Sequence, residues 1–133
     1  MRTYKLHLIR HGMTEGNENG QYIGLTDIKI TTNGIIELEK LRDAGIYPKC
    51  DLVFSSPLSR AVETAKIIKT KKEVLINYKF KEIDFGEFEG KTPEDLKDRQ
   101  DYADWLAGKL PAAPGGESAV DFATRLCTGI GET

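Results

Sequence analysis

Long apolar runs are missing from this sequence: none reaches the roughly 18 residues that a membrane-spanning helix needs. Cysteine is scarce, since Cys50 and Cys127 stand alone with no CxxC pair and no metal-ligand spacing. We therefore expect two buried, reduced thiols and a cytoplasmic location. The N-terminus is too short and too quickly charged for a signal peptide, and the sequence has no internal repeat or low-complexity tract.

Neither sign of charge dominates, because 19 basic and 21 acidic side chains leave a net charge of −2. This balance argues against a large polyanion-binding surface, so we expect neither a nucleic acid nor a membrane as partner. The 133 residues, of which 39% are hydrophobic, are enough for one domain with its own core. We therefore predict a single domain over residues 1–133.

Strand-like and helical patterns alternate along the chain. Apolar and polar residues alternate over residues 4–9, and short apolar runs follow at 52–54 and 73–78, which predicts three strands. The spacing of apolar residues predicts helices at 31–45, 57–69, 91–111 and from 118 onward. This order predicts an α/β fold: a three-layer sandwich with a mostly parallel sheet and helices on both faces.

Local signals mark where these elements begin and end. Thr31 or Thr32, Ser56 before Pro57, Thr92 and Ser118 are predicted helix caps, and Gly45 a helix end. The predicted inward-facing residues are Ile35, Leu38, Leu41 and Ala44 in the first helix, and Phe122, Leu126 and Ile130 in the last. The glycine-rich residues 12–30 are predicted to form a long ordered loop, and a loop of that length usually carries function.

The ends of the three predicted strands carry polar residues. They form three groups: Arg10 and His11; Ser55, Ser56 and Arg60; and the segment 81–87. Each residue has an ordinary structural explanation when it is taken alone, such as a helix cap or a solvated charge. Because ligands bind beyond the carboxyl ends of parallel strands, the convergence of all three groups predicts a site at this edge.

His11 could act there as a nucleophile, a general base or a metal ligand. Metal binding is disfavoured, since the neighbouring residue is a cation and the other histidine, His7, is interpreted as structural. Arginine forks bind phosphate oxygens in pairs, and Arg60 falls in the first turn of a helix, which also favours an anion. A neutral imidazole in such a pocket can attack phosphorus and form a phosphohistidine.

Phosphoryl transfer also needs a group that protonates the leaving oxygen. Glu82 is the candidate at the end of the third strand, where Ile83 and Phe85 lower the local polarity. Asp84 is its competitor, and the spacing alone does not separate the two.

The stretch LIRHGMTEGN, with Arg10, His11 and Gly12, resembles the signature of the histidine phosphatase superfamily. The resemblance continues through SSPLSRAVETA at 55–65, EIDFGEFEG at 82–90 and PGGES at 114–118, and covers essentially the whole chain. The short segment around Glu82 is more similar to the alpha-ribazole phosphatase and fructose-bisphosphatase branch than to the cofactor-dependent phosphoglycerate mutases. It implies hydrolysis of a small phosphorylated metabolite rather than phosphoryl exchange.

The resemblance also implies roles for individual residues. His11 resembles the phosphorylated nucleophile, Arg10 and Arg60 resemble phosphate clamps, and Glu82, rather than Asp84, resembles the proton donor. Two further positions resemble substrate-binding residues: Asn17, a polar residue of the pocket, and Gly24, in a loop that closes over the substrate. The resemblance implies no metal and no cofactor.

One feature of the family is missing. Relatives continue after the helix at residues 118–133 into a strand that ends in a second histidine, and then into another helix. The other histidine here, His7, lies inside the first predicted strand. We expect truncation, a strand swapped from another copy, or a cleaved or disordered tail, with truncation favoured. We also expect reduced activity and a homo-oligomer, or another contact, that covers the unpaired strand.

Overall fold

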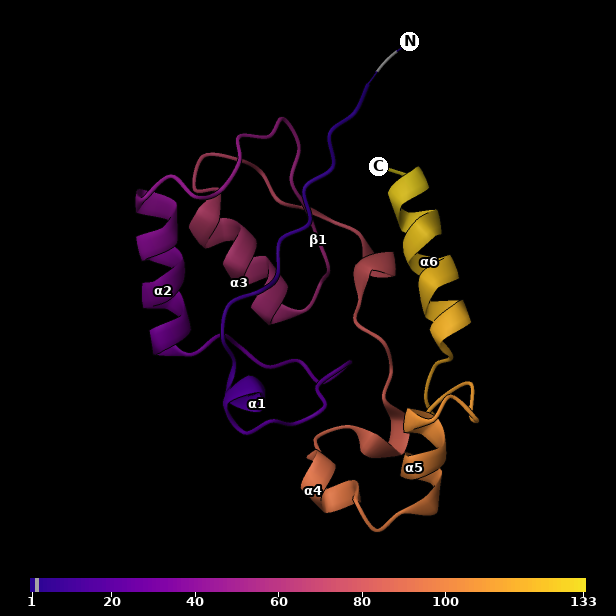
Figure 1. The fold of residues 1–133 in the computed structure, drawn as a ribbon. Helices are drawn as coiled ribbons and strands as arrows, with labels where there is room; N and C mark the ends of the chain where they lie inside the picture. The colour runs from indigo at the N-terminus through magenta and orange to yellow at the C-terminus, as the bar shows by residue number, and fades with distance from the viewer. Residues whose placement is uncertain (2) are drawn as a thin grey trace.

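The computed structural model describes residue 1 and residues 3–133, and it is an α/β fold (Figure 1). The elements follow one another as α1 (Glu15–Glu18), α2 (Thr32–Asp43), β1 (Phe54–Ser55), α3 (Ser59–Ile68), β2 (Leu75–Ile76), the 3₁₀ helices η1 (Tyr78–Phe80) and η2 (Gly86–Phe88), α4 (Pro93–Leu96), α5 (Gln100–Leu106) and α6 (Ala119–Gly131). Within the described residues, no helix has the length and the apolar character needed to cross a bilayer.

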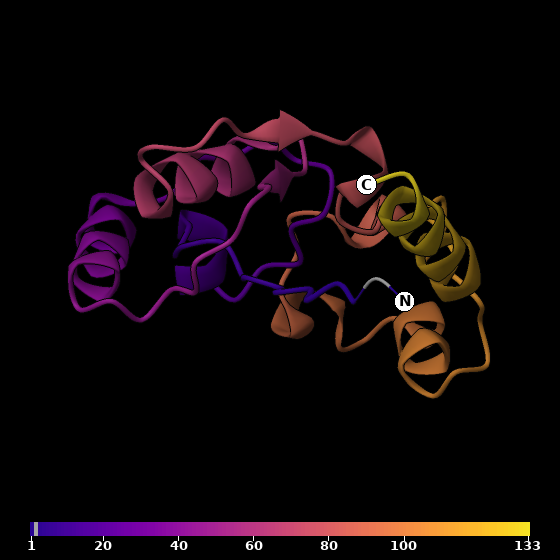
Figure 2. The same ribbon diagram turned by 90° about the horizontal axis from the view of Figure 1, so that it is seen from above.

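The sheet is small and parallel. Strands β1 and β2 pair with Phe54 opposite Leu75 and Ser55 opposite Ile76. Helices α2 and α3 lie on one side of the N-terminal segment, and α5 and α6 lie on the other, as both ribbon views show (Figures 1 and 2). The predicted α/β class is confirmed, with a parallel sheet that is shorter than the sequence indicates.

The prediction of a strand at residues 4–9 is wrong. This segment runs apart from β1 and β2 (Figure 2) and forms no ladder with any described residue. The side chains of Tyr4, Leu6 and Leu8 are 83%, 62% and 84% exposed. The alternating pattern is present, but a strand is stabilised only by neighbours that pair with its backbone.

Most helix caps fall where the sequence places them. Thr31 caps α2, Thr92 caps α4 and Ser118 caps α6, each accepting a backbone N–H with its hydroxyl. Gly45 follows α2 with a φ of +73°, a conformation that glycine adopts without strain.

Three predicted boundaries need correction. Helix α3 has Leu58 as its N-cap instead of Ser56, whose Oγ accepts the Leu58 N–H at 3.1 Å. The helix predicted at 91–111 is two helices, α4 and α5, because the chain turns between two buried side chains of one core cluster, Leu96 and Tyr102. The loop predicted at 12–30 contains the short helix α1.

Two core clusters support the structure around the site. One holds Phe88, Leu96, Tyr102 and Ala113, and the other holds Ile30, Leu38 and Ile68. Several predicted inward positions are not buried: Ile35 is 36% and Ile130 44% exposed, and Ala44 is also exposed. The expected burial of both thiols is wrong too, since Cys50 is half-buried and Cys127 is exposed on α6.

Candidate active site

The turn that carries His11 is fastened to helix α3. The Gly12 N–H donates to Thr64 Oγ1 at 2.9 Å, and Thr64 Oγ1 donates to the Arg60 carbonyl at 2.7 Å. A Cβ on Gly12 would lie 2.7 Å from Leu38 Cδ1, so a larger residue would push the turn away from α2. Helices α2 and α3, rather than a strand ladder, therefore hold this turn in place.

The His11 imidazole is half-buried and oriented by the backbone. Its Nδ1 lies 2.7 Å from the Gly12 carbonyl oxygen, which can only accept a hydrogen bond. Nδ1 therefore carries the proton, and Nε2 keeps a free lone pair.

The charge state of His11 fits this arrangement. Burial lowers the pKa of the imidazole below its usual value of 6.5, the hydrogen bond to Gly12 opposes this, and Arg60 and Arg10 lower it further. The Glu82 carboxylate raises the same pKa by a smaller amount. The net direction is downward, so the ring is neutral at pH 7 and available as a nucleophile.

Arg60 is the buried cation of the site, only 3% exposed in the first turn of α3. Its Nη1 donates to the Thr26 carbonyl at 2.9 Å and its Nη2 to the Gly24 carbonyl at 2.7 Å. A guanidinium has five N–H donors, so these two bonds leave others for an anion. The loop 24–26 thus fixes the direction in which Arg60 points.

A carboxylate that the sequence analysis missed holds that loop. Glu89 accepts the Gly24 N–H at 2.8 Å and the Thr26 N–H at 3.0 Å through Oε1. A Cβ on Gly24 would lie 2.0 Å from the Ile83 carbonyl oxygen, so only glycine fits there. The acids after Glu82 have the pattern of a solvated face, and no local signal distinguishes Glu89 from its neighbours. Gly24 contributes through its backbone, which accepts from Arg60 and donates to Glu89.

Glu89→Gln is expected to lower the free energy of unfolding by about 1–3 kcal/mol, the usual cost of removing one partner of a buried or charge-assisted hydrogen bond. Urea unfolding measures this loss. The matched control is Glu87→Gln, two residues away, whose side chain is 60% exposed and should change stability by no more than about 0.5 kcal/mol. Equal effects of the two substitutions would contradict the anchoring role of Glu89.

The two candidate proton donors have different partners. Glu82 is half-buried, accepts the Ile83 N–H at 2.9 Å, and carries a charge that acts on both His11 and Arg60. Asp84 accepts the Gly86 N–H at 2.8 Å and shapes the turn into η2. The geometry thus favours Glu82 for contact with a group bound at His11.

Arg10 and Asn17 have different environments from these residues. Arg10 is exposed beside His11, and its charge lowers the pKa of that imidazole. The Asn17 Oδ1 accepts from the Thr14 N–H and hydroxyl at 3.0 and 2.8 Å, completing the capping box of α1. The structure therefore brings His11, Arg60, Glu82 and Arg10 together, whereas Asn17 uses its carbonyl oxygen in a cap.

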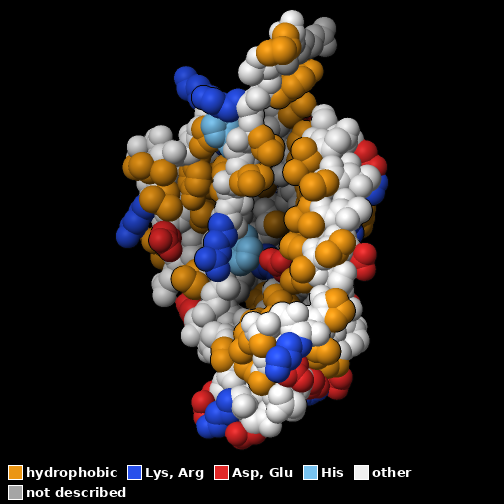
Figure 3. Space-filling model, turned by 45° about the vertical axis from the view of Figure 1, so that its right-hand side comes forward, with side chains coloured by type: hydrophobic (Ala, Val, Ile, Leu, Met, Phe, Trp, Pro, Cys, Tyr) orange, Lys and Arg blue, Asp and Glu red, His pale blue; other side chains and the backbone are white. Residues whose placement is uncertain are grey.

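The surface over this region is furrowed. Figure 3 shows a histidine side chain within a furrow bordered by hydrophobic side chains, with a basic side chain on one side and an acidic one on the other. This mixture matches a site that binds an anion beside a proton-transfer group.

A family model, histidine phosphatase superfamily (branch 1), matches residues 6–133. The chain belongs to the histidine phosphatase superfamily. It is 31% identical to the adenosylcobalamin/alpha-ribazole phosphatase of Escherichia coli K12, over 92% of this chain and 63% of the relative. It is also 31% identical to a 2,3-bisphosphoglycerate-dependent phosphoglycerate mutase of Rhizobium etli, over 91% of this chain and 63% of the relative.

The solved structure of the alpha-ribazole phosphatase of Shigella flexneri matches this histidine phosphatase superfamily chain with a TM-score of 0.81 at 30% identity. That match covers 92% of this chain and 63% of the other. The family predicted from the RHG stretch is therefore confirmed. The chain spans 63% of the length of these relatives.

Proposed function

We propose that this chain is a phosphatase that hydrolyses a small phosphate monoester through a phosphohistidine on His11. The observation that carries the proposal is the orientation of the ring: Nδ1 faces the Gly12 carbonyl, so Nε2 is the free nitrogen. The buried guanidinium of Arg60 lies in the same charged neighbourhood. Family membership supports it, because relatives with this fold bear the names of phosphatases and mutases.

The chemistry follows in two displacements. His11 Nε2 attacks phosphorus in line, an N–P bond forms, and the P–O bond to the leaving group breaks. Arg10 and Arg60 stabilise the charge on the equatorial oxygens. Glu82 gives its proton to the leaving oxygen, then takes a proton from the water that attacks the phosphohistidine and releases phosphate.

The substrate proposed is a small metabolite. A cavity of about 340 Å³ lies beside the Glu82 segment, lined by Leu25, Tyr78, Lys81, Asp84, Gly116, Glu117 and Arg125. Its volume is at the lower end of the range for small-molecule sites, and its lining is both apolar and charged. Asn17 and Gly24 are proposed to border the phosphate pocket on the loop side.

Activity is expected to be weaker than in relatives that contribute a second histidine to the phosphate pocket. The other histidine of this sequence, His7, is exposed in the segment 4–9 and does not supply that contact. The absence of one positioned electrostatic donor commonly costs about 10²–10³ in rate. A second copy of the chain that covers the exposed residues 4–9 remains part of the proposal.

We expect acid-labile ³²P label on the protein after mixing with ³²P-labelled p-nitrophenyl phosphate, and release of inorganic phosphate that EDTA leaves unchanged. Phosphate binding without label would indicate a silent binding protein instead. Transfer of the label to an added phosphoglycerate, with little free phosphate, would favour a mutase-type transferase, the alternative that the Rhizobium etli relative supports. Loss of activity with EDTA would contradict the proposed mechanism.

A further inference from the structure

Arg125 on α6 lies behind the segment that carries Glu82. Its Nη1 donates to the carbonyls of Lys79 and Lys81 at 2.7 and 2.9 Å, and its Nη2 to that of Glu82 at 3.3 Å. Residues 81–85 belong to no helix or strand, since η1 ends at residue 80 and η2 begins at 86. Their backbone carbonyls therefore depend on partners from elsewhere in the chain.

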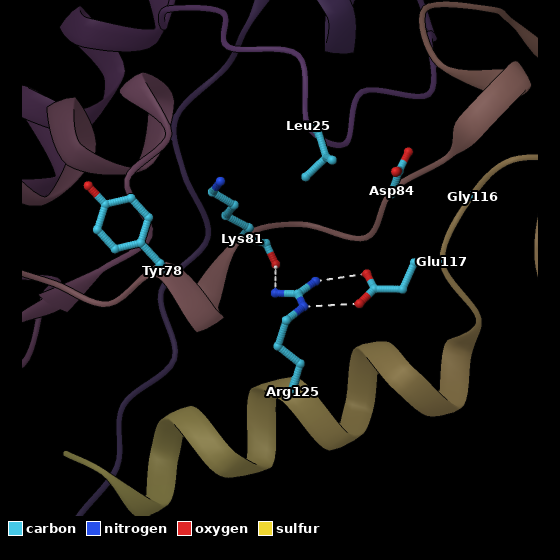
Figure 4. A pocket seen from close by; sticks show the side chains of 7 residues that line it. All are labelled: Leu25, Tyr78, Lys81, Asp84, Gly116, Glu117 and Arg125. Atoms are coloured by element: carbon cyan, nitrogen blue, oxygen red, sulfur yellow. Dashed lines mark hydrogen bonds and ion pairs between the residues drawn. The ribbon is translucent and has the colours of Figure 1, made fainter.

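Arg125 is itself fixed by Glu117. Nε donates to Oε1 at 3.0 Å and Nη2 to Oε2 at 2.8 Å, a two-point ion pair (Figure 4). The two side chains are only 25% and 19% exposed. The hydrogen bonds from Arg125 lower the pKa of the Glu117 carboxyl, so the pair is fully charged at neutral pH.

The same acidic residue also fastens the other side of the Glu82 segment. The Glu117 N–H donates to the Asp84 carbonyl at 2.9 Å. A Cβ on Gly116 would lie 2.5 Å from that carbonyl, and a Cβ on Gly86 would lie 2.2 Å from the Pro114 carbonyl. The loop 114–117 therefore packs directly on the chain that follows Glu82, and only glycine permits this approach.

We propose that Arg125, locked by Glu117, is a positioning residue that holds the Glu82 carboxyl in reach of a phosphoryl group on His11. It holds the carbonyls of residues 79, 81 and 82, while Glu117 holds that of 84. The carboxyl of Glu82 is then free to face His11 because its own backbone is fixed on both sides. This inference rests on the proposed role of Glu82 as the proton donor.

The role predicts an effect that depends on the leaving group. A poor leaving group, such as the alkoxide of glycerol 2-phosphate, needs a well-placed acid, whereas the nitrophenolate of p-nitrophenyl phosphate needs little help. In Arg125→Met, phosphoenzyme formation from glycerol 2-phosphate should slow about tenfold or more beyond any slowing with p-nitrophenyl phosphate. Arg125→Lys, which keeps the charge without the fork, should recover part of the loss.

Arg99→Met is the matched control. Arg99 makes the same two-point pair with Asp101, at 2.9 and 2.6 Å, but does not bind the carbonyls around Glu82. Arg99→Met should leave the ratio of the two rates unchanged. Equal slowing with both substrates in Arg125→Met would indicate a purely structural role and overturn the proposal.

A second measurement does not depend on activity. Because the Glu82 carboxylate raises the pKa of His11, NMR titration of the imidazole reports whether the carboxylate stays nearby. Arg125→Met should lower that pKa in the same direction as Glu82→Gln, and Glu117→Gln provides a milder variant if Arg125→Met does not fold. An unchanged His11 titration in the folded variants would overturn the positioning role. Failure of the wild-type chain to form a phosphoenzyme from either ester, with the titration shifted, would instead reject only the proposed function.

Discussion

His11→Ala is expected to abolish the acid-labile phosphoenzyme and to lower turnover of p-nitrophenyl phosphate by at least about 10³-fold, since loss of a covalent nucleophile removes most of the catalysis that such enzymes achieve. The reason lies in the ring geometry. The Gly12 carbonyl accepts the Nδ1–H at 2.7 Å, so the free nitrogen is Nε2. No other described imidazole is half-buried beside Arg60.

The matched control for this variant is His7→Ala. His7 is the other histidine of the sequence, and it is exposed on a segment without ladder partners among the described residues. Its removal should change neither label nor turnover by more than about twofold, as for most surface substitutions. Label that persisted in His11→Ala, or disappeared in His7→Ala, would show that the nucleophile is assigned to the wrong residue.

The same histidine sets an expected pH dependence. Only the neutral imidazole attacks phosphorus, and burial together with Arg60 and Arg10 lowers the pKa of His11 below 6.5. The rate of labelling by p-nitrophenyl phosphate should therefore be flat near neutral pH and fall only as the pH drops below 6.5. A fall that begins above that value would contradict the lowered pKa, and His7→Ala should keep the wild-type profile.

The parts of the fold that could be predicted depend on signals within a few residues. Thr31, Thr92 and Ser118 each cap a helix by accepting an N–H three residues ahead, so a short stretch of sequence is enough to identify them. The location of Arg60 in a first helical turn follows from the same local pattern. The RHG stretch identifies the family for a similar reason, because its residues are adjacent.

The parts that could not be predicted depend on distant partners. Residues 4–9 have the alternation of a strand, but alternation does not specify a neighbour that pairs with the backbone. Glu89 acts on Gly24, 65 residues away, and Arg125 acts on carbonyls 43–46 residues away. Neither side chain differs from its neighbours in any local pattern. The sequence places Asn17 in the phosphate pocket, yet its oxygen is used in a cap.

These distant contacts share one physical device. Side chains from helices and turns hold backbone carbonyls and N–H groups of loops: Arg60 and Glu89 hold the loop 24–26, Arg125 holds the Glu82 segment, and Thr64 holds the turn after His11. The site therefore depends on buried or half-buried polar side chains rather than on strand register. Among these side chains, Arg60 has two tasks, because it orders a loop and faces the anion.

Arg60→Met is consequently expected to lower both stability and activity. The loss of its charge should reduce phosphoenzyme formation by about 10²–10³-fold, the usual effect of removing one electrostatic donor from an active site. The Gly24 carbonyl, buried with the loop, would lose its partner at a cost of about 1–3 kcal/mol in the free energy of unfolding. Rates measured well below the melting temperature, together with urea unfolding, separate the two effects.

Two further variants distinguish the tasks of Arg60. Arg60→Lys keeps a cation but loses the fork that reaches both loop carbonyls, so we expect it to bind inorganic phosphate better than Arg60→Met while remaining less stable than the wild type. Lys66→Met, on the exposed face of the same helix α3, should change stability by no more than about 0.5 kcal/mol and leave labelling unaffected. If Arg60→Met folded and labelled at the wild-type rate, the guanidinium would serve the loop alone, and the phosphoryl oxygens would be stabilised by Arg10 instead.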